Sequence, residues 1–400
     1  MIKYWVWLAL SLDIGSSHLK HLLQRFGSPD VIYATPISEL KATFILSNSE
    51  LEKLSNKSFA KTNNILSQCE ESDIRIIPYT DNMYPESLKY IINPPAVLYV
   101  KGKLPNLSIM PTVSIVGSRK ISSHGRLAAW SLAGRLALSG MIIVSGGALG
   151  ADTAAHEGAI AVGGKTVAVL PCGINYNYLK TNEFLRKTIE DNGCLISELP
   201  PLEPLHKNAF HIRNRLLSAL SLGVIIVEAG CKSGSLITAR HAIDQGREVF
   251  VVTGKAGDKA YAGSNELIRD GAKPVFTADD VFIEYINRYT NIIDIEKAKK
   301  TSLEKIYRTF NSPAFCDDCY LNAQKDEDNS NAIKKIKKKI DETLPKNVQI
   351  VYNYIDNDVV TVDDLLTCGL PFEEILSAVT QLEIYGYIKA IPGGRYSVVY

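Results

Sequence analysis

The chain has 400 residues, a formal net charge of +1 and 22% charged residues. This length predicts two or three domains with a sizeable hydrophobic core. The near-zero charge excludes a globally basic nucleic-acid binder, so any nucleic-acid surface must be a local patch. The seven cysteines, scattered and odd in number, argue against a disulfide framework and for a reducing cytoplasm.

The first 75 residues are predicted to be helical. Residues 4–10 form an apolar run too short to span a membrane, so we interpret it as a buried helix, and no other segment approaches transmembrane length. Residues 12–30 combine a glycine turn, a periodic apolar helix and a Gly-Ser-Pro stop. Two interpretations stay open: a helix-hairpin-helix that offers backbone N–H groups to DNA phosphates, or a small helical packing domain.

Short apolar strands alternate with helical segments between residues 113 and 285, and a Pro-bounded strand at 93–105 leads into this region. The strands are β-branched and almost continuously apolar, as strands buried on both faces must be. This alternation predicts a doubly wound, mostly parallel sheet with right-handed crossovers. The predicted strands are residues 113–116, 141–144, 166–170, 195–197, 224–227 and 249–252.

A charged linker is predicted at residues 291–345. It includes the basic run 334–339, which we interpret as solvated chain rather than as a DNA site. Cys316 and Cys319 have the spacing of metal ligands but lack a second Cys or His pair nearby, so we expect no metal site there.

Residues 346–400 have the pattern of three helices and a two-stranded hairpin, which is the outline of a winged helix. The third helix, at 372–385, carries Glu373, Glu374 and Glu383 and no basic residue. Because acidic side chains disfavour contact with DNA phosphates, we expect this domain to contact protein rather than to read a major groove.

Turns that contain glycine and serine follow the first two strands of the predicted sheet. The first turn is Gly117, Ser118 and Arg119, and the second begins with Ser145 and Gly146. In a doubly wound sheet, ligands bind outside the carboxyl ends of the strands, where the strand order reverses. Glycine lets a ligand approach the backbone, serine can donate a hydrogen bond and arginine forks onto phosphate oxygens. We therefore expect these turns to form an anion site.

Two further turns belong to the predicted site. Ser233, Gly234 and Ser235 open a helix after the fifth strand, and Asn265 begins a helix after a glycine-rich loop. No strand is followed by a dinucleotide fingerprint or a Walker A loop, and no catalytic triad spacing stands out. The pattern favours a binding protein over an enzyme, with neither a cofactor nor a metal.

A segment after the fourth strand interleaves cations with an aromatic ring, because Lys207 and Arg213 flank Phe210. Such a pattern suits a single strand, whose phosphates follow the charges while a base stacks on the ring. The alternative is that Phe210 belongs to the core and the arginines of this segment pair with Glu198 or Glu228.

Two other titratable side chains have open roles. Glu228 ends the fifth strand and is either catalytic or orients Arg213 or Arg215. For His156, packing or hydrogen bonding beside the second helix is favoured over a role as a base.

The order of these motifs resembles the DNA-processing protein A (DprA/Smf) family over roughly residues 95–285. The residues that carry the resemblance are Gly117-Ser118-Arg119, Ser145-Gly146, Asp152, His156, Arg213-Asn214-Arg215, Ser-Gly-Ser-Leu-Ile-Thr-Ala at 233–239, Gly246-Arg247, Asn-Glu-Leu-Ile at 265–268 and Gly271-Ala272. The resemblance implies a cytoplasmic protein that binds single-stranded DNA and forms a homodimer. It also implies that the protein helps to load a RecA-type recombinase on incoming DNA during natural transformation.

The resemblance also assigns roles to individual residues. Arg119 and Lys207 would hold phosphates, Phe210 would lie beside the bases and Arg213 would add positive charge.

Two positions depart from the family pattern. Leu149 stands where the family usually has an arginine, and His211 stands where it has a proline. The first change removes a cation from the site, so either the affinity is lower or other residues carry it. The second change loosens the backbone after Phe210.

Together these patterns predict an α/β protein with an extended Rossmann-like sheet. Its predicted domains are a helical domain of the SAM or helix-hairpin-helix type (1–75), a DNA-binding domain (76–290), a linker (291–345) and a winged-helix-like domain (346–400). The main alternative function is a nucleoside-monophosphate hydrolase of the related Rossmann-like class, although residues 229–236 lack the glutamate that such enzymes carry. A third reading is an adaptor that acts through its C-terminal domain.

Overall fold

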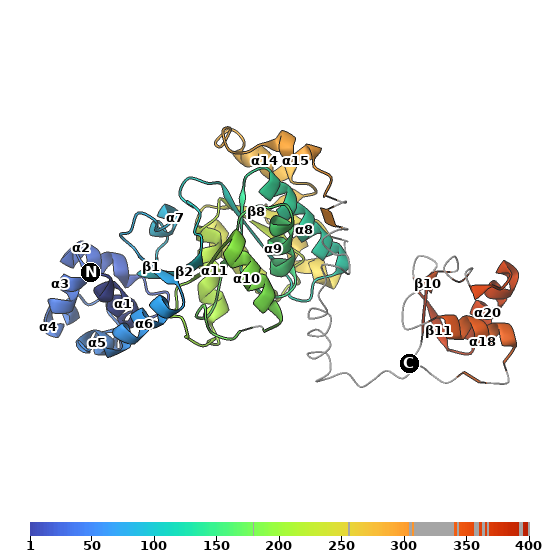
Figure 1. The fold of residues 1–400 in the computed structure, drawn as a ribbon, viewed down its shortest axis with the longest axis horizontal. Coiled ribbons are helices and arrows are strands. Elements are labelled where there is room, and N and C mark those ends of the chain that lie inside the picture. Colours follow the sequence, from blue (N-terminus) through green and yellow to red (C-terminus); the bar gives the residue numbers. More distant parts are fainter. Residues whose placement is uncertain are drawn as a thin grey trace. The chain divides into compact units, whose positions relative to one another are not determined.

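The computed structural model describes residues 1–178, 180–254, 257–303, 306–307, 340–341, 344–355, 360–361, 365, 368–391 and 395–398. The chain forms two compact units, residues 1–317 and 318–400 (Figure 1). Cys316, Cys319 and the basic run at 334–339 lie outside the described residues.

The N-terminal part is helical, as predicted. Its helices are α1 (Ile2–Ser11), α2 (His18–Phe26), α3 (Pro29–Ala34), α4 (Ile37–Lys41), α5 (Asn48–Ser55) and α6 (Ala60–Glu71). The apolar run in α1 is a buried helix, because Trp5, Trp7 and Leu8 pack with Leu19 and Leu22 of α2 in one core. Among the described helices, none combines the length and the hydropathy that a membrane crossing requires.

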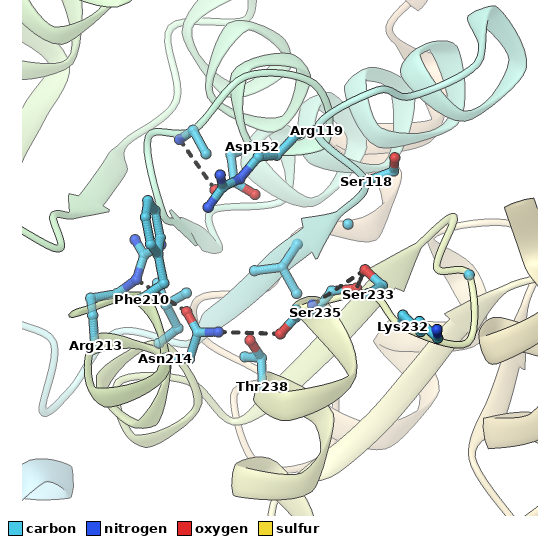
Figure 2. A pocket seen from close by; sticks show the side chains of 16 residues that line it. Ser118, Arg119, Asp152, Phe210, Arg213, Asn214, Lys232, Ser233, Ser235 and Thr238 are labelled. Carbon is cyan, nitrogen blue, oxygen red and sulfur yellow. Dashed lines mark hydrogen bonds between the residues drawn. The ribbon is translucent and has the colours of Figure 1, made fainter. Parts of the chain in front are cut away.

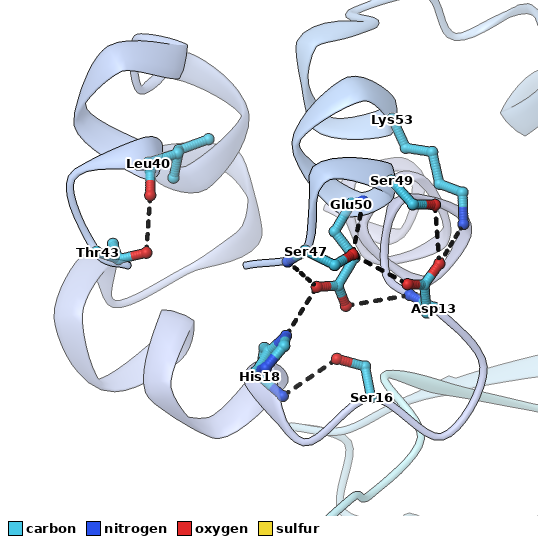
Figure 3. A network of polar contacts seen from close by, with 9 residues as sticks. All are labelled: Asp13, Ser16, His18, Leu40, Thr43, Ser47, Ser49, Glu50 and Lys53. Atoms are coloured by element: carbon cyan, nitrogen blue, oxygen red, sulfur yellow. Dashed lines mark hydrogen bonds and ion pairs between the residues drawn. The ribbon is translucent and has the colours of Figure 1, made fainter. Parts of the chain in front are cut away.

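The turn between α1 and α2 is packed against the rest of the unit. Asn93 donates from Nδ2 to the carbonyl of Gly15 (3.1 Å), and Ile212 lies close to the same glycine. At the start of the turn, the Asp13 carboxylate accepts from Lys53 Nζ (2.6 Å), beside a hydrogen bond between His18 Nδ1 and Glu50 Oε2 (2.8 Å) (Figure 3). A turn that is packed and acidic in this way favours the packing interpretation over phosphate binding.

A nine-stranded sheet forms the centre of the first unit, in the order β1-β2-β6-β5-β4-β3-β7-β8-β9. From β6 to β9 in this order, neighbouring strands are parallel. At one edge, β2 pairs with β6 in the antiparallel direction, and β1 pairs with β2 in the same way. The sheet is therefore mostly parallel, as predicted. Its strands are β1 (Ile74–Pro78), β2 (Val97–Gly102), β3 (Thr112–Gly117), β4 (Ile142–Ser145), β5 (Thr166–Val169), β6 (Gly193–Ser197), β7 (Gly223–Val227), β8 (Glu248–Val252) and β9 (Lys273–Val275).

Helices cover both faces of this sheet. Side chains of β3 alternate between two cores, Val113 and Ile115 facing one and Val116 the other. The first core contains residues of α8 (Ser123–Leu138), α9 (Ala151–Ala161), α14 (Asp279–Tyr285) and α15 (Ile295–Lys300). The second contains residues of α7 (Glu86–Lys89), α11 (Ala209–Ala219), α12 (Ser235–Asp244) and α13 (Ala262–Arg269). The described part of this unit also contains α10 (Glu183–Asn192) and two 3₁₀ turns, Lys180–Asn182 and Lys259–Tyr261.

The strand order reverses at β3. From β3 the chain builds β4, β5 and β6 toward one edge, then returns to build β7, β8 and β9 on the other side. The carboxyl ends of β3 and β7 are therefore neighbours at the switch point, which is where a doubly wound sheet binds its ligands.

The second unit contains α18 (Lys346–Tyr354), α20 (Phe372–Ile384) and a three-stranded antiparallel sheet. Its strands are β10 (Val360–Thr361), β11 (Ile388–Ile391) and β12 (Arg395–Val398), in the order β10-β12-β11. The first and third predicted helices and both hairpin strands are present. A helix was expected between these two, over residues 361–369, but Thr361 lies in a strand and residues 362–364 and 366–367 lie outside the described residues. The winged-helix assignment stays a prediction.

Candidate functional site

A cavity of about 410 Å³ opens at the carboxyl ends of β3 and β7 (Figure 2). It lies at the switch point of the sheet, where the sequence predicted an anion site. Its walls come from the loop after β3, the start of α9, α11, and the loop that joins β7 to α12. The lining residues are Val116, Gly117, Ser118, Arg119, Ala148, Asp152, Phe210, Arg213, Asn214, Leu217, Gly230, Lys232, Ser233, Gly234, Ser235 and Thr238.

The loop after β3 is fixed on both sides by backbone hydrogen bonds. Ser118 donates its N–H to the carbonyl of Glu228 (3.0 Å), and Ala151 donates to the carbonyl of Ser118 (3.1 Å). A Cβ on Gly117 would overlap the carbonyl of Val227, so this glycine lets β3 and β7 lie side by side. Arg119 follows Ser118 in this loop, and its side chain is exposed while the backbone beside it is held by these hydrogen bonds.

Arg119 and Phe210 form a stacked pair in the cavity wall. The guanidinium carbon lies 4.1 Å from the centre of the Phe210 ring, and Figure 2 shows the two side chains facing each other. Tyr178 contacts the same ring in an edge-on arrangement with the centres 5.9 Å apart. The half-buried Phe210 therefore lines the cavity instead of filling the core.

Arg213 is a buried residue of the cavity lining. It is 5% exposed and donates from Nη1 to the carbonyls of Gly146 (2.8 Å) and Val169, and from Nε to Asn214 Oδ1 (3.2 Å). Burial lowers the pKa of Arg213 and raises the pKa of Asp152, whose carboxylate accepts from the N–H of Ala148 (3.3 Å). The proximity of the two groups opposes both shifts. Arg213 thus joins the loops after β4 and β5 through its Nη1 group and contributes positive potential to the cavity.

The loop between β7 and α12 supplies the opposite wall. The hydroxyls of Ser233 and Ser235 lie 2.7 Å apart, and Asn214 donates to the carbonyl of Gly234 (3.3 Å). Lys232 is exposed beside them. Sequence reasoning missed Lys232, Asn214 and Thr238 as lining residues, although Lys232 directly precedes the predicted turn.

Four of the predicted site residues do not line the cavity. Ser145 is buried and donates to the carbonyl of Ile115 (2.6 Å). Gly146 contributes only its carbonyl, to Arg213. Lys207 is exposed, and Asn265 is half-buried on α13. The other predicted residues, Gly117, Ser118, Arg119, Phe210, Arg213, Ser233, Gly234 and Ser235, lie together in the lining.

Glu228 does not orient either arginine, which was one of the two roles considered for it, and its catalytic role stays untested. Its carboxylate accepts from the N–H of Ser122 (3.0 Å) and from the Ser122 hydroxyl (2.5 Å), so it holds the start of α8. It contacts neither arginine: Arg215 pairs with Glu198 (2.5 Å), and Arg213 binds carbonyls. The backbone of Glu228 has φ +56°, a conformation that costs a non-glycine residue energy and marks a constrained site.

His156 packs inside the unit, as the favoured interpretation expected. It is fully buried on α9, and its Nδ1 lies 2.7 Å from Thr166 Oγ1 on β5. Among the described residues there is no cluster of three or more His, Cys, Asp or Glu side chains that could hold a metal ion.

The part of the chain that contains the cavity is similar to known proteins. Residues 75–286 match the family model of DNA recombination-mediator protein A. The chain is 35% identical over 260 residues to DNA processing protein DprA of Bacillus subtilis (strain 168), covering 65% of this chain and 88% of that protein. It is 32% identical over 328 residues to Protein Smf of Escherichia coli (strain K12), covering 81% of this chain and 78% of that protein.

A solved structure has the same fold. The X-ray structure of DNA processing protein A (DprA) from Streptococcus pneumoniae superposes with a TM-score of 0.61 at 32% identity, covering 70% of this chain and 95% of that chain. All residues that line the cavity fall within the matched range 75–286.

Proposed function

Because this chain belongs to the DNA recombination-mediator protein A family, we propose that it binds single-stranded DNA in the cavity at the ends of β3 and β7. We further propose that it is a recombination mediator that catalyses no reaction itself. The relatives are named for DNA processing, which supports a role on DNA. The proposal that the bound DNA is a single strand rests on the chemistry of the cavity.

The stacked pair of Arg119 and Phe210 carries the proposal. An arginine that is stacked on a ring keeps its N–H edge available to phosphate oxygens, and its second face can receive a base. A single strand offers a phosphate and an unpaired base face together, whereas the bases of a duplex are already stacked and paired.

The lining chemistry favours binding over catalysis. None of the lining residues that the structure describes is a histidine or a cysteine, and the acid among them, Asp152, is buried beside Arg213. Serine hydroxyls without an adjacent base are weak nucleophiles. The alternative, hydrolysis of nucleoside monophosphates, is tested by incubation of the protein with AMP. We expect no free adenine, and adenine release that Asp152→Asn abolishes would contradict the proposal.

The proposal extends to partners through the family resemblance. The protein would work in the cytoplasm as a homodimer and help to load a RecA-type recombinase on DNA taken up during transformation. The second unit would serve protein contact, which the acidic residues Glu373, Glu374 and Glu383 on α20 support.

Binding of an oligo-dT strand over a series of salt concentrations tests the function. Arg119→Ala should weaken binding about tenfold and reduce the slope of log affinity against log salt by about 0.7, because one phosphate contact is lost. Phe210→Ala should cost about 1–3 kcal/mol of binding free energy through lost stacking. Lys207→Ala, in the same assay, tests the phosphate contact that the resemblance implies outside the cavity.

The matched control is Lys165→Ala. Lys165 is exposed and directly precedes β5, so it lies at the amino edge of the sheet, away from the cavity. This variant should bind as the wild type does. Wild-type affinity of Arg119→Ala would show that the cavity is not the DNA site.

A further inference from the structure

We infer that the N-terminal end of α12 forms a second phosphate subsite of the cavity, built from Lys232, Ser233, Ser235 and Thr238. This inference rests on the proposed function and deepens it. It assigns to the wall opposite Arg119 a phosphate of the same strand, and it adds Lys232 and Thr238 to the binding residues.

Thr238 is the observation that points to a ligand. Its side chain lines the cavity and is 1% exposed, yet its hydroxyl has no hydrogen-bond partner among the residues that the structure describes. In Figure 2 the hydroxyl points from α12 toward the hydrogen bond of Asn214 with the Gly234 carbonyl, in the wall of the cavity. A buried hydroxyl without a partner costs stability, and such groups are rare in native proteins. A ligand oxygen in the cavity would satisfy it.

The surroundings of Thr238 are rich in hydrogen-bond donors. The two serine hydroxyls, Ser233 and Ser235, bond to each other (2.7 Å), which uses one O–H and leaves the second to donate. Helix α12 has ten residues and no acid in its first turn, so the positive end of its dipole is not neutralised locally. Lys232 adds a full charge at the rim.

These groups favour a phosphate over a base edge. The Lys232 ammonium can only donate, and the serine and threonine hydroxyls can donate as well, whereas phosphate oxygens only accept. A phosphate also carries the negative charge that Lys232 and the positive end of the helix dipole attract, and a base edge is neutral. Figure 2 places Arg119 and the β7–α12 loop on opposite sides of the cavity, so a strand that crosses it would have phosphates bound at both walls.

Thr238→Val in the full chain is the sharpest test, because it removes the hydroxyl and keeps the shape. We expect the free protein to melt at the same or a higher temperature, since an unsatisfied group is removed. Oligo-dT binding should weaken at least about threefold with an unchanged salt slope, because a neutral hydrogen bond releases no counterion. A variant that binds as the wild type does would overturn the subsite.

Lys232→Met provides the second arm and, being an exposed substitution, leaves folding intact. It should weaken binding and reduce the salt slope by about 0.7, whereas the matched control Lys165→Met should do neither. An unchanged slope for Lys232→Met would also overturn the subsite.

Two comparisons separate the remaining possibilities. Arg119→Ala reports on the proposed function: if it weakens binding while Thr238→Val and Lys232→Met do not, the subsite is wrong and the function stands. If Arg119→Ala has no effect either, the function fails with it. Strands with and without a 5′-phosphate should bind equally, because the subsite takes an internal phosphate, and a preference for the phosphorylated end would contradict this assignment.

Discussion

The two arginines that line the cavity, Arg119 and Arg213, have different roles. Arg119 is exposed on a fixed loop and presents its guanidinium to a ligand. Arg213 is buried, and its Nη1 group donates to carbonyls of the neighbouring loops. An alanine at 213 would therefore disturb the fold as well as binding, so Arg119 is the cleaner probe of DNA contact.

Glu228 is expected to act on binding through the loop that carries Arg119. Its carbonyl accepts from Ser118 and its carboxylate from Ser122, so one residue holds the loop at both ends. Glu228→Ala should lower the free energy of unfolding by about 1–3 kcal/mol, because the hydrogen bonds that the amide and hydroxyl of Ser122 donate to a charged carboxylate are lost. Oligo-dT affinity should fall as well, and Glu228→Gln should restore part of it.

Urea unfolding and oligo-dT titration of the same samples check this prediction. Glu266→Ala, an exposed change on α13, is the control. A Glu228→Ala protein that binds with full affinity would show that Arg119 does not depend on this anchor.

At the residue scale, sequence reasoning located the loops of the site but not every side chain in them. Arg119 and Phe210 follow from the motif order, and both line the cavity. Thr238 was missed because it lies within a helix, and only the rotation of α12 shows which of its residues face the cavity. Lys207 and Asn265 lie outside the lining, since the sequence does not reveal how the loops bend.

Helix α9 is tied to β5 by a histidine that must stay neutral. The Thr166 hydroxyl donates to the carbonyl of Ile143 (2.9 Å), so His156 Nδ1 is the donor in its own bond to Thr166. Nε2 is then the unprotonated nitrogen, and it is buried without a hydrogen-bond partner in the described part of the chain. Burial lowers the pKa of His156 to about 3 from its usual 6.5.

This arrangement predicts a loss of stability in mild acid. Because the folded pKa lies below the unfolded one, the contribution of His156 is complete above pH 6.5 and is lost as the pH falls toward 3. Between pH 7 and pH 5 the loss should be about 2 kcal/mol. In His156→Gln, urea unfolding at the two pH values should differ by that much less than in the wild type, whereas the exposed change His124→Gln should leave the difference unaltered. An equal pH dependence in His156→Gln would refute the assignment.

At the element scale, the predictable strands were the ones buried on both faces. The six strands expected from continuous apolar runs all occur, because only a doubly covered sheet requires such runs. The strands β1 and β9 form the two edges and were missed. β9 has three residues, among them Lys273 and Pro274, and such polar or proline-containing edges lack an apolar signal.

At the scale of the whole molecule, the proposed DNA site belongs to one unit. Every residue that lines the cavity lies within residues 1–317. A chain that ends at residue 317 should therefore bind oligo-dT with the affinity and salt slope of the full chain, measured side by side. A clear loss of affinity would instead assign DNA contacts to residues 318–400 and contradict the protein-contact role expected there.

The N-terminal helices share a core with the sheet. Leu8 and Leu19 belong to the same cluster as Ala168 and Leu170 of the β5 region and Leu195 of β6. The match to the family model begins only at residue 75. A fragment cut there would expose these sheet side chains to water, so we expect a fragment that includes the N-terminal helices to be more stable than one that begins at residue 75.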